Sequence, residues 1–249
     1  MAFDERFEAL QSAASRKDEM RLISNEWVKK AGDIGQQYLW DWMGLPIIQL
    51  STDIVQLQEI IFRVKPDLII ETGVARGGSL AFYASMLCLL DIADNAEPLR
   101  STRRVLGIDI DIREPNAAAI KQHPLHPKIE LLTGSSIDKT VIETVHQRAE
   151  SFQSVLVSLD SNHSHNHVFA ELNAYAPLVS PGSYCIVFDT VIEDLPAGHF
   201  DDRPWGVGNN PKTAVNEWIK SHPDFEIDDS IDEKLMISVA PGGYLKRKR

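Results

Sequence analysis

The sequence has few cysteines and no long apolar run, and these absences exclude several classes of protein. Cys88 and Cys185 are the two cysteines among 249 residues, and both lie in apolar stretches typical of core positions. A secreted disulfide framework is therefore excluded. No apolar run reaches the roughly 18 residues that a membrane span needs, and the acidic start MAFDERFEAL does not resemble a signal peptide. We expect a cytoplasmic protein without a membrane span.

Positive charge is also scarce. The formal net charge is −11, and the one dense basic run is the terminal LKRKR. A chain with this charge repels the phosphate backbone, so we do not expect a nucleic-acid partner. Hydrophobic residues make up 43% of the sequence, which is enough for a substantial core and excludes a disordered chain.

Short apolar segments alternate with helical patterns through the middle of the chain. A helical pattern over residues 51–64 ends at KPD, and five strand-like segments follow, each but the last leading into a helix: LIIETG, RVLGIDI, KIELLTG, SVLVSLD and GSYCIVFD. This alternation predicts an α/β fold with a parallel sheet covered by helices on both faces. In such sheets ligands bind outside the carboxyl ends of the strands, where the strand order reverses.

The two ends of the chain depart from this alternation. Helical patterns near residues 4–14 and 18–31, followed by Tyr38, Trp40 and Trp42, predict an N-terminal segment over residues 1–50 that acts as a lid or an oligomer contact. Residues 51–249 form the main domain. Within it, residues 196–212 are predicted as a long functional loop whose aromatic and hydrogen-bonding groups suit the hydroxyl face of a sugar. The C-terminal FEIDDSIDEKLMISVAPGGYLKRKR is predicted as a strand, a turn and a second strand.

Glycines follow the first strand of the alternating region, in DLIIETGVARGGSLAFYA. Gly73 and Gly77 let the backbone approach a ligand closely, and Ser79 can cap the next helix. The spacing differs from the G-x-G-x-x-G pattern of dinucleotide folds, which argues against NAD. Glu71 lies at the strand end, where a carboxylate repels phosphate but attracts a cationic sulfonium or ammonium group.

Polar residues also end the next two strands. Asp109 suits the two hydroxyls of a ribose, because one carboxylate can accept a hydrogen bond from each. Gly134, Ser135 and Ser136 leave room for a flat adenine edge. Each feature also occurs in proteins without a cofactor, but their order on three successive strand ends favours S-adenosylmethionine.

Two further strands end in aspartates, Asp160 and Asp189. If these strands are neighbours, both carboxylates reach the same sheet edge and form an oxygen site suited to magnesium. A cation there would lower the pKa of an acceptor hydroxyl, and His163, three residues after Asp160, can take the proton. Helix capping is the alternative role for either aspartate.

Two more histidines follow His163 in LVSLDSNHSHNHVFAEL. His165 and His167 would join His163 in an extended strand, but the following residues favour a helix. We therefore assign them solvent, capping or packing roles, and a zinc site built from the three histidines stays as the alternative.

These stretches carry a family resemblance. The quoted glycine turn, VLGIDIDIR, LLTGSSID, LDSNHSHNHVFAELNAYAPLVSPGSYCIVFDT and PGGYLKR resemble the bacterial methyltransferases named for cephalosporin hydroxylase, a family similar to rhamnosyl O-methyltransferases. The resemblance runs from about residue 40 to the C-terminus. It implies a Rossmann-like class I methyltransferase fold with a mostly parallel seven-stranded sheet, S-adenosylmethionine as donor and Mg²⁺ or a similar cation. It also implies a homo-oligomer whose acceptor is a hydroxyl of a sugar, polysaccharide or glycosylated secondary metabolite.

The resemblance also implies roles for individual residues. In the cofactor site, Glu71, Gly73 and Ser79 would contact the methionine part, Asp109 the ribose and Ser136 the adenine. Asp160 and Asp189 would bind the metal. His163 would remove the proton from the acceptor. We expect Gly77, Ser135 and Asp160 to contact the same cofactor. Relatives often carry Glu-Asp after the fifth strand, whereas this chain has Phe188 before Asp189, so Glu193, Asp194 or waters would have to complete the metal shell.

Three alternative functions remain. An NAD-dependent oxidoreductase shares the fold and the ribose acid but does not explain the Asp160 and Asp189 pair. A non-catalytic nucleotide-binding scaffold would leave the metal site empty, and Phe188 supports it. A non-haem iron hydroxylase needs two histidines and one carboxylate on one face and does not explain the adenosine-type features, so hydroxylation is the poorer interpretation.

Overall fold

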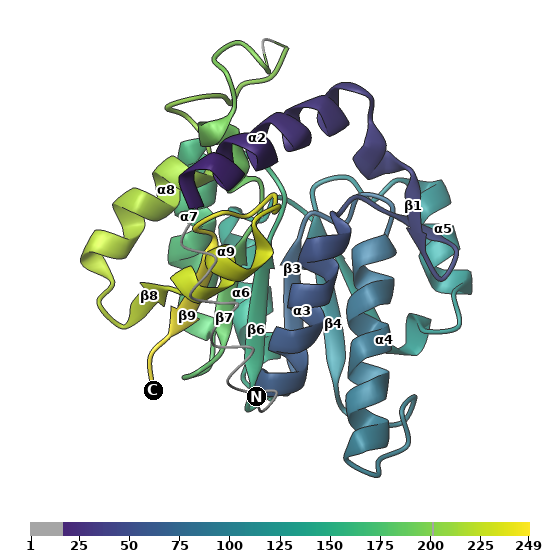
Figure 1. Cartoon of the computed structure of the whole chain (residues 1–249). Helices are drawn as coiled ribbons and strands as arrows, with labels where there is room; N and C mark the ends of the chain where they lie inside the picture. The colour runs from purple at the N-terminus through teal and green to yellow at the C-terminus, as the bar shows by residue number, and fades with distance from the viewer. Residues whose placement is uncertain (1–16, 201) are drawn as a thin grey trace, which may run out of the picture.

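Continuous apolar runs form the central strands of one seven-stranded sheet in the computed structural model, which describes residues 17–200 and 202–249 (Figure 1). The strand order is β5-β4-β3-β6-β7-β9-β8. The first five of these pair in parallel, while β9 is antiparallel to β7 and to β8. The strands are β3 (Leu68–Thr72), β4 (Arg104–Asp109), β5 (Ile129–Thr133), β6 (Val155–Leu159), β7 (Tyr184–Val187), β8 (Phe225–Ile227) and β9 (Tyr244–Arg247). The predicted mostly parallel, seven-stranded Rossmann-like sheet is confirmed.

Helices cover both faces of this sheet because alternate strand residues point to opposite sides. In β3, Ile69 packs with the helices on one face, and Leu68 and Ile70 pack with those on the other. The first face carries α3 (Ser51–Val64), α4 (Gly78–Ala93), α5 (Glu114–Gln122) and α9 (Asp229–Leu235), and the second carries α6 (Lys139–Ala149), α7 (His165–Tyr175) and α8 (Pro211–Trp218). Burial on both faces explains why the strands read as continuous apolar runs rather than alternating ones.

The strand order reverses between β3 and β6. The chain adds β4 and β5 on one side of β3 and then returns to place β6 on the other side. At this point the loop after β3 lies directly against the loop after β6: a Cβ atom built on Gly73 would lie 2.0 Å from the carbonyl oxygen of Asp160. This crevice at the carboxyl ends of the strands is where an open α/β sheet binds its ligand.

The N-terminal segment lies over that crevice. Helix α2 (Lys17–Asp33) crosses above the carboxyl ends of the strands in Figure 1. A short turn (Gln36–Tyr38) and a hairpin of β1 (Trp40–Trp42) and β2 (Leu45–Ile47) follow. The helix predicted over residues 18–31 is confirmed, and the one predicted near 4–14 lies outside the described residues.

The C-terminal prediction was wrong in one element. Residues 229–235, expected to form a turn, form helix α9 between the two antiparallel strands. Ile231 packs into the core on the α3 side. This tertiary contact stabilises a helix that the acidic sequence DDSIDE does not predict. None of the described helices combines the length and apolar character that crossing a membrane requires.

Candidate active site

Three side chains that the sequence predicted to act together meet at the edge of the sheet. Asp160 follows β6, His163 lies in the loop before α7, and Asp189 follows β7, the neighbour of β6. One side-chain ligand atom from each lies within 4.8 Å of the others. The Nε2 atom of His163 is 3.2 Å from the Oδ2 atom of Asp189. The sheet therefore brings together two carboxylates and an imidazole, which can hold a metal ion or accept a proton.

The carboxyl group of Asp160 is in an unfavourable place for a negative charge. Burial, and after it the charges of Asp189 and Glu71, raises its pKa well above the usual value. Its Oδ2 atom accepts a hydrogen bond of 3.1 Å from the side-chain amide of Gln49. A cation bound beside Asp160 and Asp189 would relieve this repulsion, so the electrostatics of the pair fit a metal.

Backbone strain occurs at the second carboxylate. Asp189 has φ = 55° and ψ = 22°, a left-handed conformation that few residues other than glycine adopt. This conformation turns the chain from β7 into the short helix η4 (Thr190–Asp194).

The residues expected to complete the metal shell have other partners. The Oε2 atom of Glu193 accepts hydrogen bonds from the backbone of Gly208 and the side chain of Asn210. Asp194 forms an ion pair of 2.6 Å with Lys212. Phe188 is buried in the core on the α3 side of the sheet. Among the described residues, Glu193 and Asp194 do not join the group that could hold a metal, so completion of the metal shell by either of them or by waters stays a prediction. His163 is the third side chain within reach of the metal position.

A cavity of about 580 Å³ opens in front of these residues. The glycine loop after β3, the N-terminal segment and residues within 195–200 and 202–205 line its walls. The predicted site residues among its lining are Gly73, Gly77, Ser79, Asp160, His163 and Asp189. The volume is in the range of small-molecule and cofactor sites.

The glycine loop adopts the conformation for which its glycines were singled out. Gly73 and Gly77 have φ angles of 91° and 85°, a region in which a side chain is disfavoured. The capping role expected for Ser79 is wrong, because helix α4 begins at Gly78 and the hydroxyl of Ser79 donates to Glu71 at 2.8 Å. Burial raises the pKa of Glu71 to about 8, against the lowering effect of this hydrogen bond and with a further rise from Asp109.

Asp109 holds the glycine loop in place. Its Oδ2 atom accepts hydrogen bonds from the backbone amides of Val74 and Ala75, at 2.8 and 3.3 Å, and its Oδ1 atom accepts one from Asp111. Each carboxylate oxygen has further lone pairs for ribose hydroxyls. The ribose role of Asp109 stays a prediction, with a loop-positioning role beside it.

The serines assigned to the adenine lie farther from the cavity. Ser136 is buried, with its hydroxyl 3.0 Å from the Nε2 atom of His167 and its carbonyl oxygen accepting from Tyr175. Glu71, Asp109, Ser135 and Ser136 do not line the cavity described above. Their contacts with a cofactor therefore stay predictions.

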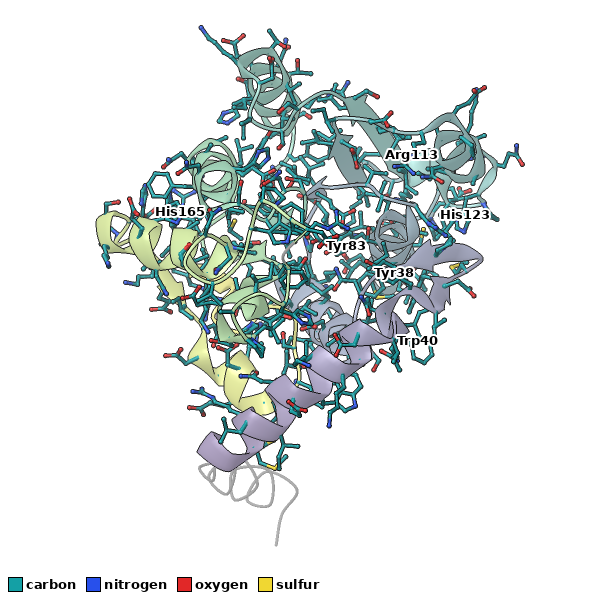
Figure 2. All side chains as sticks on the ribbon, turned by 90° about the horizontal axis from the view of Figure 1, so that it is seen from above. Tyr38, Trp40, Tyr83, Arg113, His123 and His165 are labelled. Atoms are coloured by element: carbon teal, nitrogen blue, oxygen red, sulfur yellow. The ribbon has the colours of Figure 1, made fainter. Side chains whose placement is uncertain are left out.

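His165 and His167 lie in helix α7, as predicted. The ring of His165 is 2.8 Å from the hydroxyl of Thr213 in α8, and Figure 2 shows this residue at the side of the molecule. His167 turns toward Ser161 and the buried Glu171. Among the described residues, neither histidine joins a group able to hold a metal, so the three-histidine zinc site is contradicted.

The N-terminal segment has two different surfaces. Toward the cavity it presents residues of α2, of the turn Gln36–Tyr38 and of the β2–α3 connection, including Val28, Asp33, Tyr38 and Gln49. Its outward side exposes large apolar side chains: Ile23, Ile34, Leu39 and Trp40. Tyr38 and Trp40 are labelled in Figure 2. The lining residues agree with a lid and the exposed ones with an oligomer contact, and both roles stay predictions.

The sequence interpretation missed Gln49, which contacts Asp160 across 111 residues of chain. It also missed Glu171, which is fully buried and accepts from the hydroxyl of Ser161, the residue after Asp160. An isolated glutamine after an aromatic hairpin carries no local signal. A glutamate in the middle of the amphipathic α7 has the spacing of a core position, and that spacing was the available signal.

Comparison with known proteins places the chain in a family. A family model described as "Rhamnosyl O-methyltransferase/CmcI" matches residues 35–248. The protein belongs to the rhamnosyl O-methyltransferase/CmcI family. Relatives named rhamnosyl O-methyltransferase are 27% identical over 216 residues in Mycobacterium leprae and 28% identical over 208 residues in Mycobacterium tuberculosis. These matches cover 85% and 83% of this chain and 86% and 77% of the relatives.

Solved structures of CmcI share the fold. A CmcI structure named for Mg and SAM has a TM-score of 0.54 at 19% identity, covering 85% of this chain and 78% of that one. A second, named for SAH, has a TM-score of 0.51 at 16% identity, covering 84% and 81%. The predicted family and fold class are confirmed, and with them the predicted enzyme class, an S-adenosylmethionine-dependent O-methyltransferase.

Proposed function

We propose that this enzyme transfers a methyl group from S-adenosylmethionine to a hydroxyl of a sugar or a glycosylated molecule, in a reaction that depends on Mg²⁺. One observation carries the proposal: Asp160, His163 and Asp189 converge in a cavity at the reversal point of the sheet. The names of the mycobacterial relatives support the sugar acceptor, and the names of the CmcI structures support the two cofactors.

The cavity is suited to a cationic donor. Asp160 and Asp189 line this end of the cavity, and their carboxylates would attract the sulfonium and the ammonium of S-adenosylmethionine and repel the pyrophosphate of NAD. Gly73 and Gly77 let the backbone come close to the bound molecule. These features favour an adenosyl sulfonium over a dinucleotide.

The residues that would hold the metal are Asp160 and Asp189, and His163 lies within reach of the same position. Two carboxylates and open positions for waters and substrate oxygens match the preferences of Mg²⁺. When bound, the cation would polarise the acceptor hydroxyl and lower its pKa. The identity of the ion is tested by titration with Mg²⁺.

His163 is positioned to accept the proton of the acceptor hydroxyl. Its imidazole contacts the carboxylate of Asp189 at 3.2 Å, and a neighbouring carboxylate stabilises the imidazolium that forms when the ring takes a proton. Trp205 packs against the same imidazole, with ring centroids 4.8 Å apart and the planes nearly perpendicular. The indole thereby restricts the orientation of the ring and keeps water from one side of it.

The acceptor is proposed to bind between the N-terminal segment and residues 195–200 and 202–205. Aromatic side chains there (Tyr38, Phe200, Trp205) provide flat apolar surfaces for a sugar ring, and charged or polar groups provide hydrogen-bond partners. The acceptor oxygen would displace the methyl group from the sulfonium, which becomes a thioether, while the hydroxyl proton passes to His163. Orientation of the two reactants would lower the barrier by roughly 7–11 kcal/mol.

The test measures turnover and donor binding in the same variants. With a panel of rhamnosides and other deoxyhexosides as acceptors, His163→Ala should lower the rate of S-adenosylhomocysteine formation by about 10²–10⁴-fold and leave the affinity for the donor nearly unchanged. His165→Ala is the matched control, because His165 contacts α8 outside the site, and it should keep normal turnover. Unchanged turnover in His163→Ala would remove the assignment of the base.

Binding separates the remaining functions. Titration of the metal-stripped protein with S-adenosylmethionine, with S-adenosylhomocysteine and with NAD should show binding of the two adenosyl ligands alone. Binding of NAD instead would support the oxidoreductase, and binding of the adenosyl ligands without turnover on any hydroxyl acceptor would support the scaffold.

A further inference from the structure

The turn that carries Asp189 is joined to residues 238–243, the segment that leads into β9. Three hydrogen bonds connect residues 187–191 to this segment. They run from the Val187 N–H to the Gly243 carbonyl (2.8 Å), from the Thr190 hydroxyl to the Pro241 carbonyl (2.9 Å) and from the Val191 N–H to the Val239 carbonyl (3.2 Å). Because the donors lie on both sides of Asp189 in the sequence, this segment holds the residue in its left-handed conformation.

Asp53 in turn holds this segment. The residue lies in the first turn of α3 and is fully buried. Its Oδ2 atom accepts a hydrogen bond from the Val239 N–H at 3.0 Å. Its Oδ1 atom accepts from the hydroxyl of Ser238 at 2.6 Å and from that of Tyr244 at 2.9 Å. One carboxylate therefore contacts the start of the segment and the residue that follows it, and each bond is stronger in these dry surroundings than in water.

Close packing couples the position of the segment to that of the turn. A Cβ atom built on Gly243 would lie 2.1 Å from the carbonyl oxygen of Val187, so the two backbones are in direct contact. Val239 lines the cavity together with Asp189 and Val191. Since packed backbones leave no free space between them, displacement of the segment displaces the turn as well.

The two carboxylates of the candidate metal site are held by different parts of the sheet. The backbone N–H of Asp160 donates to the carbonyl oxygen of Thr72 in the parallel part, at 3.0 Å. Asp189 depends instead on the segment before β9, the antiparallel strand next to β7. The separation of the two carboxylates therefore depends on how firmly Asp53 fixes this segment.

We propose that Asp53 is a positioning residue for the metal site and acts through residues 238–243. By fixing this segment it keeps Asp189 close to Asp160, at a separation that one ion can bridge. The inference rests on the proposed function, which gives this site to Mg²⁺. Asp53 neither lines the cavity nor belongs to the group of described residues able to hold a metal. Its effect on the ion is therefore indirect, as is that of groups that orient metal ligands in other proteins.

The test measures Mg²⁺ binding and cofactor binding in the same folded variants. In calorimetric titrations of the metal-stripped protein, below the unfolding temperature of each variant, Asp53→Ala should weaken Mg²⁺ binding by about tenfold or more. Binding of S-adenosylhomocysteine without Mg²⁺ should change by less than about twofold, because the glycine loop is held by Asp109 and not by residues 238–243. A variant that only loosens the fold would weaken both.

Asp53→Asn separates the hydrogen bonds from the charge. Its amide oxygen can still accept from the Val239 N–H, and its NH₂ group can donate to the two hydroxyls, which accept as well as donate. This variant should keep the Mg²⁺ affinity within about twofold of that of the unaltered protein.

Ser238→Ala removes the hydroxyl bonded to Asp53 and leaves the carboxylate in place. It should weaken Mg²⁺ binding by about fivefold, and it provides the same test if Asp53→Ala does not fold.

Asp228→Ala is the matched control. Asp228 accepts hydrogen bonds from the hydroxyls of Tyr184 and Ser230, and none of its side-chain bonds in the described part of the chain reaches residues 238–243. The variant should lower the unfolding temperature and leave the Mg²⁺ affinity unchanged, which separates a general loss of stability from a loss of positioning.

Equal Mg²⁺ affinity in Asp53→Ala and in the unaltered protein overturns the inference, and where Asp53→Ala does not fold, an unchanged affinity in Ser238→Ala overturns it. A loss as large for S-adenosylhomocysteine as for Mg²⁺ also overturns it. So does a loss in Asp53→Asn as large as in Asp53→Ala, because the effect would then come from charge. If the unaltered protein binds S-adenosylhomocysteine but not Mg²⁺, the metal part of the proposed function fails and the inference fails with it.

Discussion

Carboxylates at the two ends of the sheet differ in whether the chain supplies lysine and arginine partners for them. At the amino ends of the strands, Asp91 is fully buried, and so is Lys128, whose ammonium lies 2.5 Å from it. Arg103 reaches the other oxygen of Asp91 at 2.7 Å and also pairs with Asp94. At this end the chain supplies both the negative charges and the positive charges that neutralise them.

At the carboxyl ends of the strands, Arg76 and Arg203 line the cavity, but no lysine or arginine of the described residues forms an ion pair with the clustered acids. Asp160 and Asp189 lie together, with Glu71 near enough to raise the pKa of Asp160 further, and the titratable partner present is His163. Folding selects against buried charge that is not neutralised. A chain that neutralises its acids with lysine and arginine at one end, and leaves Asp160 and Asp189 without such a partner at the other, reserves the second end for a cationic ligand. The comparison assigns stability to the first cluster and function to the second.

The largest expected effect is on stability, at the paired end. Lys128→Met leaves Asp91 buried with part of its positive partner removed, and it should lower the free energy of unfolding by about 3–5 kcal/mol. Urea denaturation at pH 7 measures this. Lys139→Met, which removes an exposed helical ion pair with Glu143, should change little. Similar stabilities for the two variants would contradict the structural role of the paired cluster.

Ionisation of Glu71 should make the stability of the protein depend on pH, with an effect of intermediate size. Its pKa rises from 4.5 to about 8 on folding, chiefly through burial. Below pH 4.5 the folded and unfolded states both hold the proton, and above that the unfolded state ionises first. The protein should therefore lose stability relative to Glu71→Gln as pH rises from about 4.5 to 8, by on the order of 3 kcal/mol. Denaturation of both proteins across this range measures the difference, and a constant difference would contradict the buried neutral acid.

Asp160→Asn should change the free energy of unfolding less than Lys128→Met does, and in the opposite direction. Removing one of the clustered charges while keeping an acceptor for Gln49 should stabilise the ligand-free protein by about 1 kcal/mol. It should also abolish any stabilisation by Mg²⁺. Thermal unfolding with and without Mg²⁺ checks both effects. Destabilisation of the ligand-free variant would show that Asp160 is a structural residue like Asp91.

Much of this arrangement was predictable from local patterns. Continuous apolar runs gave the five parallel strands because burial on both faces leaves no room for polar alternation. Asp160 and Asp189 were predicted to meet because residues that end neighbouring parallel strands share one sheet edge, and the placement of His163 followed from its spacing after Asp160.

The features that escaped prediction depend on contacts between distant parts of the chain. Helix α9 forms in an acidic stretch because Ile231 is buried against the core. Ser79 bonds Glu71 instead of capping α4, since Gly77 occupies the cap position. Gln49 reaches Asp160 from a segment that precedes the whole sheet. No pattern within one segment encodes such contacts.

The most direct test of the account is calorimetric titration of the metal-stripped protein with Mg²⁺. One ion should bind per chain, and Asp189→Asn should weaken this binding by about tenfold or more. Asp194→Asn should leave it unchanged, because Asp194 is paired with Lys212. Equal Mg²⁺ affinity in the unaltered protein and in Asp189→Asn would contradict the claim that Asp160 and Asp189 form a cation site.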